Sequence, residues 1–269
     1  MRIEPLDIFN FLVPKDGNSR LVAGDVAYGQ DARLRLDIYA PASRERGPLP
    51  VVVFFYGGSW DSGKKSAYAF VGRALAALGY VVVVPDYRLL PHVEYPVFLR
   101  DCVAALDWVS DTIAAYGGDA DRLLTAGHSA GAYNAVMAVL DRSLGLSARV
   151  RAVAGLSGPY DFYPFDGPVS LRVFGQAEDA PATQPVNHVW AGAPPMFLAT
   201  GEDDRMVLPR NSDRLTKALS GVGVAAEARH YPGIDHAGML LALSRPLRSR
   251  AAVLADMAAF FERVMADQT

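Results

Sequence analysis

Apolar and polar positions along the chain form two alternating kinds of segment. Short, mostly apolar runs, typical of parallel strands covered on both faces, occupy residues 51–55, 80–84, 122–126, 150–156, 195–200 and 225–231. Apolar residues at helical spacing fill much of the chain between and after them, at 68–78, 98–116, 132–140, 210–219 and 248–265. The segment Leu34–Tyr39 alternates polar and apolar residues, which predicts a half-exposed edge strand. This order of segments predicts an α/β fold with a doubly wound sheet.

Composition limits the classes of protein that fit. A length of 269 residues suits a single α/β domain spanning 1–269, and 51% hydrophobic with 20% charged residues is ordinary for a globular enzyme. A net charge of −3 gives no reason to expect nucleic acid or an anionic membrane as a partner. The single cysteine, Cys102, excludes an internal disulfide and is expected in or near the core.

Membrane and export signals are also missing from the sequence. No apolar run reaches the 18 or so residues of a membrane span. The stretch Met1–Asp7 lacks the basic start, apolar stretch and cleavage site of a signal peptide. We therefore expect a cytoplasmic protein without a membrane span. No heptad or apolar stripe in the sequence defines an oligomeric state.

The pentapeptide Gly127-His128-Ser129-Ala130-Gly131 carries the first candidate for chemistry. It joins the apolar run 122–126 to the helical run 132–140, so Ser129 lies at a tight turn between a strand and a helix. This is the setting of a nucleophile elbow, in which small glycines let strand and helix approach closely. The alternative is a serine that only caps a helix, which is common after strands.

A serine nucleophile needs a base and a carboxylate that orients it, in the chain order Ser, Asp or Glu, His. An acidic cluster follows the predicted strand 195–200 and offers Asp203 or Asp204, with Glu202 a remote third. His236 lies on a loop after the last predicted strand, between small residues. The other four histidines are worse placed: His230 within a strand, His128 in the elbow but predicted to point elsewhere, and His92 and His188 in proline-rich loops.

Acyl transfer also needs donors for the negative oxygen that develops on the carbonyl. One donor should be the amide of Ala130, directly after the nucleophile. Others should follow an earlier strand, and Tyr56-Gly57-Gly58-Ser59-Trp60 ends the most strand-like segment of the chain. Glycines there allow the backbone to approach a ligand closely.

Four motifs in order resemble those of α/β-hydrolase esterases related to hormone-sensitive lipase, nearest the small bacterial members and the kynurenine-formamidase-like esterases. They are Tyr56–Trp60 for the family's H-G-G-x-W, Asp86–His92 for D-Y-R-L-A-P-E, Gly117–Arg122 for G-G-D-P-D-R, and the elbow itself. The resemblance runs from about Leu34 to near the C-terminus. It implies a mostly parallel, twisted sheet of about eight strands with helices on both faces and a short lid at 158–193.

The same resemblance assigns roles to residues. It implies an oxyanion hole formed by the amides of Gly58, Ser59 and Ala130. The family's G-x-x-D-x-x-V spacing ends on Val207 and so favours Asp204 as the acid. It implies no cofactor and no metal. Short esters fit a small lid, which indicates a serine carboxylesterase for short-chain or small aryl esters, with an arylformamidase as the alternative.

Two positions depart from the family pattern. Tyr56 replaces the family's histidine, so it either takes over the bracing of the oxyanion loop or lines the acyl pocket. The glutamate of D-Y-R-L-A-P-E is absent, with His92 in its place. We predict that Asp86 and Arg88 form a structural ion pair rather than catalytic groups.

Other functions fit the sequence less well. Gly58–Lys64 matches most of a phosphate-binding G-x-x-x-x-G-K-[ST] loop, but Lys65 occupies the hydroxyl position. The five histidines show no metal-ligand spacing. A hydrolase-like fold that only binds ligands remains a remote alternative, because such proteins lose a catalytic residue and here all three have candidates.

Overall fold

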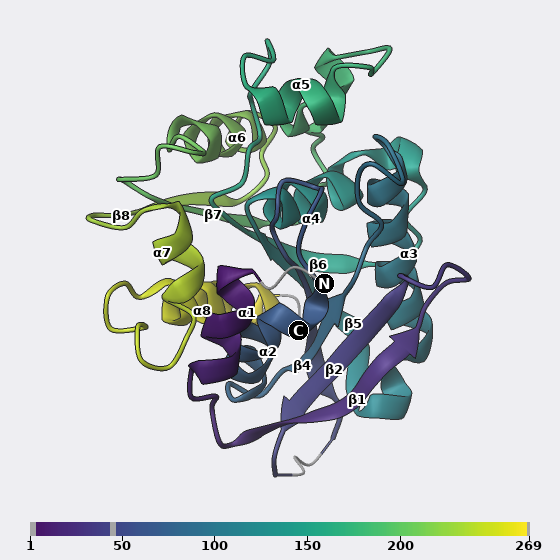
Figure 1. The fold of residues 1–269 in the computed structure, drawn as a ribbon, viewed down its shortest axis with the longest axis vertical. Coiled ribbons are helices and arrows are strands. Elements are labelled where there is room, and N and C mark those ends of the chain that lie inside the picture. The colour runs from purple at the N-terminus through teal and green to yellow at the C-terminus, as the bar shows by residue number, and fades with distance from the viewer. Residues whose placement is uncertain (1–3, 44–46, 268–269) are drawn as a thin grey trace.

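The structure, a computed structural model, describes residues 4–43 and 47–267, so the first three residues of the stretch Met1–Asp7 lie outside it. Eight strands form one sheet in the order β1-β2-β4-β3-β5-β6-β7-β8 (Figure 1). The strands β1 and β2 run antiparallel to their neighbours and the other pairs are parallel. Their bounds are Ser19–Ala27 (β1), Arg35–Pro41 (β2), Leu49–Phe55 (β3), Val81–Pro85 (β4), Gly118–His128 (β5), Val150–Leu156 (β6), Met196–Gly201 (β7) and Ala226–Tyr231 (β8).

Helices cover both faces of the sheet, as predicted. Helices α2 and α8 pack on one face, and α3, α4 and α6 pack on the other (Figure 1). The α-helices are Pro5–Leu12 (α1), Ala69–Ala76 (α2), Val97–Thr112 (α3), Ala130–Leu140 (α4), Pro168–Phe174 (α5), Arg210–Gly221 (α6), His236–Leu241 (α7) and Val253–Ala266 (α8). Short 3-10 helices span Lys65–Tyr68, Ile113–Tyr116, Arg142–Leu144, Pro181–Thr183 and Pro185–His188.

The apolar runs of the sequence form the centre of the sheet. Residues 51–55 of β3 and 81–84 of β4 are wholly buried. Full burial of such a side chain contributes about 1.5–3 kcal/mol, so these two strands anchor the core. Cys102, on α3, is also fully buried, which confirms its predicted place in the core.

The prediction of a half-exposed edge strand at Leu34–Tyr39 is wrong. All of this segment except Leu34 belongs to β2, which lies between β1 and β4 inside the sheet. Its polar residue Asp37 is 7% exposed and accepts hydrogen bonds from Lys65 Nζ at 2.8 Å and from the Asp25 amide at 2.9 Å. The polar–apolar alternation gave a wrong prediction because Asp37 is buried and paired with Lys65 instead of facing solvent. The edge of the sheet is formed by β1, a strand that the sequence did not predict.

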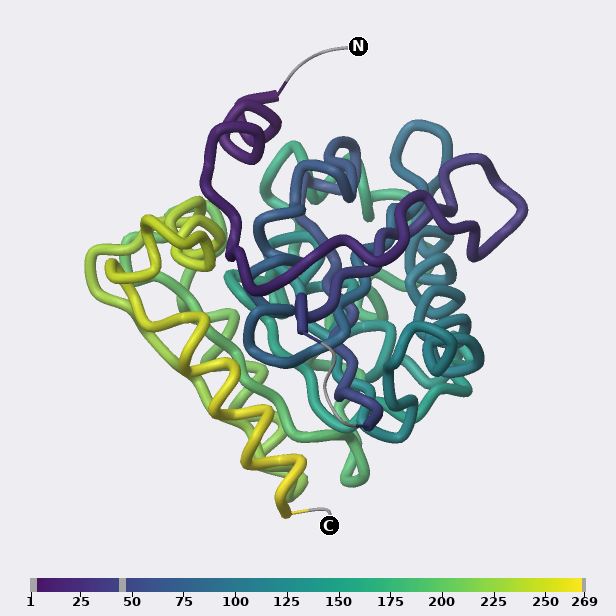
Figure 2. Tube along the Cα trace, turned by 90° about the horizontal axis from the view of Figure 1, so that it is seen from below, coloured from purple at the N-terminus to yellow at the C-terminus, as the bar shows by residue number. Residues whose placement is uncertain are grey.

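The carboxyl ends of the parallel strands gather the loops that matter for chemistry. The turn after β5 carries Ser129, and the loop after β7 carries Asp204. His236, predicted on a loop after the last strand, is instead the first residue of α7. Residues of helices α1 and α7, which are far apart in sequence, line one cavity near these carboxyl ends. Figure 2 shows α1 at the outside of the molecule. Among the described residues, no helix combines the length and apolarity that crossing a membrane requires.

Candidate active site

Ser129 adopts a strained backbone at the predicted turn. Its φ of 56° and ψ of −124° lie outside the regions that ordinary side chains favour. A Cβ on Gly127 would lie 2.2 Å from the Gly131 carbonyl oxygen, and one on Gly131 would lie 2.0 Å from that of Phe55. Both flanking glycines are therefore needed for β5, the turn and α4 to pack as they do.

Three predicted side chains form a continuous hydrogen-bonded chain. His236 Nε2 lies 2.9 Å from Ser129 Oγ, and His236 Nδ1 lies 2.8 Å from Asp204 Oδ2. With Nδ1–H donating to the carboxylate, Nε2 is free to accept the serine proton. This arrangement can activate Ser129 for attack on a carbonyl.

Asp204 is distinguished from its acidic neighbours by its surroundings. Its side chain is fully buried, and Oδ1 accepts hydrogen bonds from the amides of Met206 at 3.0 Å and Val207 at 2.8 Å. Burial raises the pKa of Asp204, but the hydrogen bonds from His236 and Val207 outweigh it and leave the pKa below its usual value. Asp203 and Glu202 are exposed.

The predicted oxyanion loop has an unusual backbone. Gly58, Ser59 and Trp60 have φ values of 130°, 52° and 59°. For Ser59 and Trp60 this left-handed backbone costs on the order of 1–3 kcal/mol each. Within the described part of the chain, the amides of Gly58 and Ser59 donate to no protein acceptor. They are free to bind a ligand oxygen.

Contacts from other elements hold this strained loop. Trp60 Nε1 donates to Asn134 Oδ1 of α4 at 2.9 Å, in a fully buried contact. The Trp60 carbonyl accepts from the Leu90 amide at 2.9 Å, and the Gly58 carbonyl accepts from the Ser62 amide at 3.0 Å. The helix that begins at Ala130 therefore also anchors the loop that faces it.

Tyr56 braces the loop and does not line a cavity at Ser129. Its ring is fully buried, and its hydroxyl donates to Asp86 Oδ1 at 2.7 Å. Arg33 donates to the Tyr56 hydroxyl at 3.0 Å and to the Gly63 carbonyl at 2.7 Å. Of the two roles considered for Tyr56, these contacts favour bracing.

The predicted ion pair between Asp86 and Arg88 is wrong. Asp86 accepts from Tyr56 and from the Lys65 amide at 2.7 Å. Arg88 instead binds Asp101 of α3, with its Nη2 2.6 Å from Oδ1. The two side chains are therefore engaged by different partners, Asp86 by the loop that Tyr56 braces and Arg88 by α3.

His128 lies against the site, contrary to the prediction that it points elsewhere. Its Nε2 is 2.9 Å from the carbonyl oxygen of His236, and the two rings are 4.8 Å apart. Burial and the neighbouring His236 lower the pKa of His128 to about 3, so it is neutral and donates Nε2–H to that carbonyl. Since 108 residues separate the two histidines, no local sequence signal reveals this contact.

Two cavities meet at Ser129. The α1 cavity, about 380 Å³, is lined by His236 and by apolar residues of α1 and α7: Leu6, Phe9, Leu240 and Leu241. The α5 cavity, about 340 Å³, is lined by Ala130 and by Trp60, Phe162, Val169, Phe174 and Val207. The sequence predicted aromatic residues from 158–193 near the site but gave no sign that α1 contributes.

The remaining histidines serve other contacts. His230 lies 2.8 Å from Asp213, and His188 lies 2.6 Å from the Ala182 carbonyl. His92 is exposed. Within residues 4–43 and 47–267, no group of three or more histidine, cysteine or acidic side chains is placed to hold a metal ion.

Known proteins share this sequence pattern and fold. The sequence model of the BD-FAE family matches residues 36–219. The chain is 34% identical over 232 residues to carboxylesterase NlhH of Mycobacterium tuberculosis, covering 77% of this chain and 72% of that protein. It is 31% identical over 258 residues to isoprenylcysteine alpha-carbonyl methylesterase ICME of Arabidopsis thaliana, covering 86% and 59%.

The plant methylesterases are longer proteins, and the chain spans between 52% and 61% of their length. Among solved structures, esterase B from Lactobacillus rhamnosis matches with a TM-score of 0.85 at 20% identity, covering 97% of this chain and 91% of that one. At that identity the likeness establishes the α/β-hydrolase fold.

Proposed function

The chain belongs to the BD-FAE family of α/β-hydrolase proteins, and from this we propose that it is a serine carboxylesterase acting on short-chain or small aryl esters. The observation that carries the proposal is the hydrogen-bonded chain of Ser129, His236 and Asp204. His236 Nε2 lies 2.9 Å from Ser129 Oγ, and His236 Nδ1 lies 2.8 Å from Asp204 Oδ2. Relatives named as a carboxylesterase and as a methylesterase support ester hydrolysis as the reaction.

The proposed cycle begins with the serine. Ser129 Oγ bonds to the ester carbonyl carbon while His236 Nε2 takes its proton, and the carbonyl π electrons move onto oxygen. Asp204 keeps the imidazole in the required tautomer and stabilises the imidazolium. Collapse of the intermediate breaks the bond to the alcohol oxygen, which takes the proton from His236. Water then repeats both steps on the acyl-enzyme and releases the acid.

The negative oxygen of each intermediate needs fixed donors. We assign this role to the amides of Gly58, Ser59 and Ala130. Each such donor is worth on the order of 10²–10³ in rate in serine hydrolases. The unpaired amides of Gly58 and Ser59, together with the bracing of the loop by Trp60, support the assignment.

The two cavities give the ester an orientation. The leaving alcohol must lie near His236, which protonates it, so we place the alcohol in the α1 cavity. The acyl group then extends past Ala130 into the α5 cavity, where residues 158–193 act as a short lid and wall. Both cavities fall near the lower end of the roughly 300–1,000 Å³ typical of ligand sites, which suits small esters.

Initial rates on p-nitrophenyl esters from acetate to laurate, with an N-formyl aromatic amide alongside, test the proposal. We expect activity highest on short esters and a loss on the order of 10⁴-fold or more in Ser129→Ala. Unchanged melting temperature and circular dichroism would show that this variant is folded. Full activity in Ser129→Ala would refute the mechanism, and a faster serine-dependent rate on the formamide would make the protein a formamidase.

A further inference from the structure

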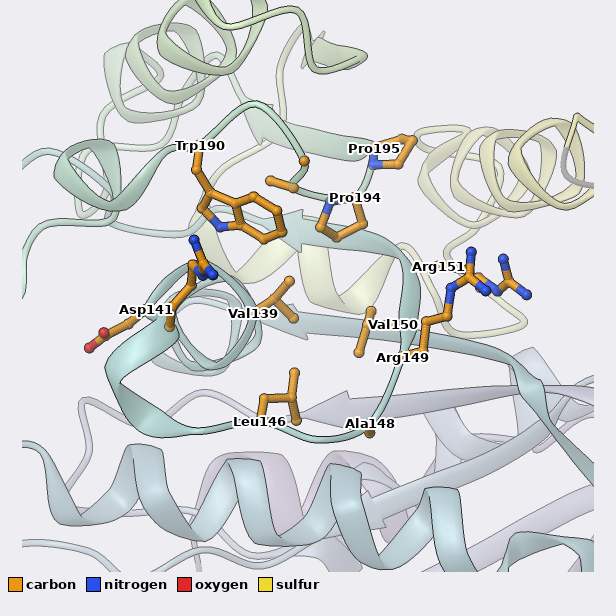
Figure 3. A pocket seen from close by; sticks show the side chains of 13 residues that line it. Val139, Asp141, Leu146, Ala148, Arg149, Val150, Arg151, Trp190, Pro194 and Pro195 are labelled. Carbon is orange, nitrogen blue, oxygen red and sulfur yellow. The ribbon is translucent and has the colours of Figure 1, made fainter.

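A cavity of about 600 Å³ lies at the amino ends of strands β6 and β7 (Figure 3). Ser129 lies at the other end of the strands, after the carboxyl end of β5. The cavity is lined by Val150, the first residue of β6, and by Pro195, directly before β7. Val139, in the last turn of α4, also lines it, whereas Ser129 precedes the first turn of that helix. The cavity is therefore separate from the proposed catalytic site.

Apolar side chains and one aromatic wall line one part of this cavity, and charged side chains line the rest. The indole of Trp190 lies beside Pro194 and across the cavity from Leu146 (Figure 3). Val139 and Val150 also line this part. A Cβ on Gly192 would lie 2.4 Å from the Trp190 ring, so only glycine allows the ring this position. The Arg142 guanidinium lies over the ring, 5.3 Å from its centroid. The aromatic wall is thus held in place by its neighbours.

The polar groups at the cavity are mostly unused donors. Trp190 Nε1 is buried and has no hydrogen-bond partner among the described residues. The exposed guanidinium groups of Arg142 and Arg149 make no ion pair with any part of the chain that the structure describes. Asp141 Oδ1 accepts from the Ser143 amide at 3.0 Å and from its hydroxyl at 2.6 Å, and the carboxylate points away from the Trp190 indole (Figure 3). Positive charge and an N–H donor are therefore left without an acceptor.

We propose that this cavity binds an organic carboxylate with a flat apolar body. The carboxylate would accept hydrogen bonds from Arg142 and Trp190 Nε1, and a planar group would pack on Val139, Val150 and Pro194. The unpaired buried N–H of Trp190 requires a hydrogen-bond acceptor. The guanidinium of Arg142 favours an anionic acceptor over a neutral one. The volume of about 600 Å³ lies within the usual range for small-molecule sites.

Isothermal titration with 2-naphthoate, and with uncharged 2-naphthamide as its matched control, tests this site. We expect saturable binding of the naphthoate that weakens with salt, and little binding of the amide. Arg142→Gln should weaken binding about tenfold, and Trp190→Phe, which keeps a ring but removes the N–H, should weaken it several-fold. Arg263→Gln, an exposed arginine on α8, serves as the control for total charge and should change nothing.

A variant of the catalytic region separates this site from product binding at Ser129. Val169→Trp narrows the α5 cavity and should leave naphthoate affinity unchanged. If Val169→Trp abolishes binding and Arg142→Gln does not, the carboxylate binds at the serine and the proposal is wrong. Equal binding of 2-naphthamide, or no binding of naphthoate at millimolar concentration, would also overturn it. None of these outcomes depends on whether the protein hydrolyses esters.

Discussion

At the scale of single residues, Asp204 and Asp203 are adjacent in sequence but differ in what they contact. In Asp204→Asn, the amide oxygen must still accept from the amides of Met206 and Val207, which turns the NH2 group toward His236. Nδ1 must then be the unprotonated nitrogen, so Nε2 carries the proton and cannot accept one from Ser129. We expect kcat on a short ester to fall on the order of 10⁴-fold.

Asp203→Asn is the matched control, because it makes the same change one position earlier at an exposed side chain. Its kcat should remain within about threefold of the wild type, since exposed substitutions away from a site have small effects. Melting temperatures of both variants would show whether either one is unfolded. A large loss in Asp203→Asn with a small loss in Asp204→Asn would move the acid by one position.

The residues that could be predicted from sequence are those with local signals. Ser129 lies in a strand–turn–helix motif, and His236 and Asp204 follow strands in a fixed order. His128 and Asn134 could not be found in this way. Their contacts join residues that are 108 and 74 positions apart in the chain. From the sequence alone, either residue could equally be an ordinary buried side chain without a role at the site.

At the scale of elements, the oxyanion loop and α4 are joined by the bond between Trp60 Nε1 and Asn134. Asn134→Leu removes the acceptor and leaves a buried N–H unpaired. Because Ser59 and Trp60 hold left-handed backbone angles, we expect the loop to relax and misplace its amides. The result should be a fall in kcat of about tenfold or more, less than the 10²–10³-fold cost of losing a donor outright.

Thr125→Val provides a control of similar cost to stability. Thr125 is fully buried in β5, and its hydroxyl donates to the Val53 carbonyl at 3.1 Å, away from the loop. Steady-state kinetics on a short ester, corrected for the folded fraction, would compare the two variants. Equal losses of kcat would show that Asn134 acts only through global stability.

The helices α1 and α5 line opposite sides of Ser129 and should control different parts of the ester. Ethyl butyrate and butyl acetate are isomers that exchange the longer chain between acyl and alcohol. Val169→Trp, in the α5 cavity, should lower kcat/KM for ethyl butyrate, and Leu6→Trp, in the α1 cavity, should lower it for butyl acetate. Each effect should be about tenfold or more, since one methylene is worth 10–200-fold in an apolar pocket.

Each variant is the control for the other, because both add the same side chain beside the same serine. If both variants lowered the two rates equally, the assignment of alcohol to α1 and acyl group to α5 would be wrong. The part played by α1 could not be predicted from its sequence. Leu6 and Phe9 join Ser129 and His236 in one cavity only in the folded chain, and no local pattern in Pro5–Leu12 indicates this contact.

At the scale of the whole molecule, the layered α/β architecture was predictable because continuous apolar runs mark buried parallel strands. The runs 51–55, 80–84 and 150–156 correspond to β3, β4 and β6 at the centre of the sheet. The antiparallel edge was not predictable. Strand β1 is mostly exposed, and the burial of Asp37 in β2 depends on Lys65, a residue outside the sheet. The pairing of Asp37 with Lys65 forms only in the folded molecule, so the pattern of apolar and polar residues in the sequence does not indicate it.

The stability of the whole molecule should depend on pH through His128. Burial and the adjacent His236 lower the pKa of His128 to about 3, whereas an unfolded histidine has a pKa of about 6.5. The unfolded state therefore binds an extra proton below pH 6.5, so this contribution to stability is full above that pH and is lost as the pH falls toward 3. The slope is about 1.4 kcal/mol per pH unit in this window.

Denaturant unfolding of the wild type and of His128→Gln at several pH values between 7 and 4.5 would measure this contribution. Glutamine can still donate to the His236 carbonyl but does not titrate, and the other four histidines are common to both proteins. The free energy of unfolding of the wild type should fall by about 2–3 kcal/mol more than that of the variant across the two units below pH 6.5. Parallel curves would mean that His128 takes up its proton in the folded protein, which requires an acceptor at Nδ1 where none is present among the described residues.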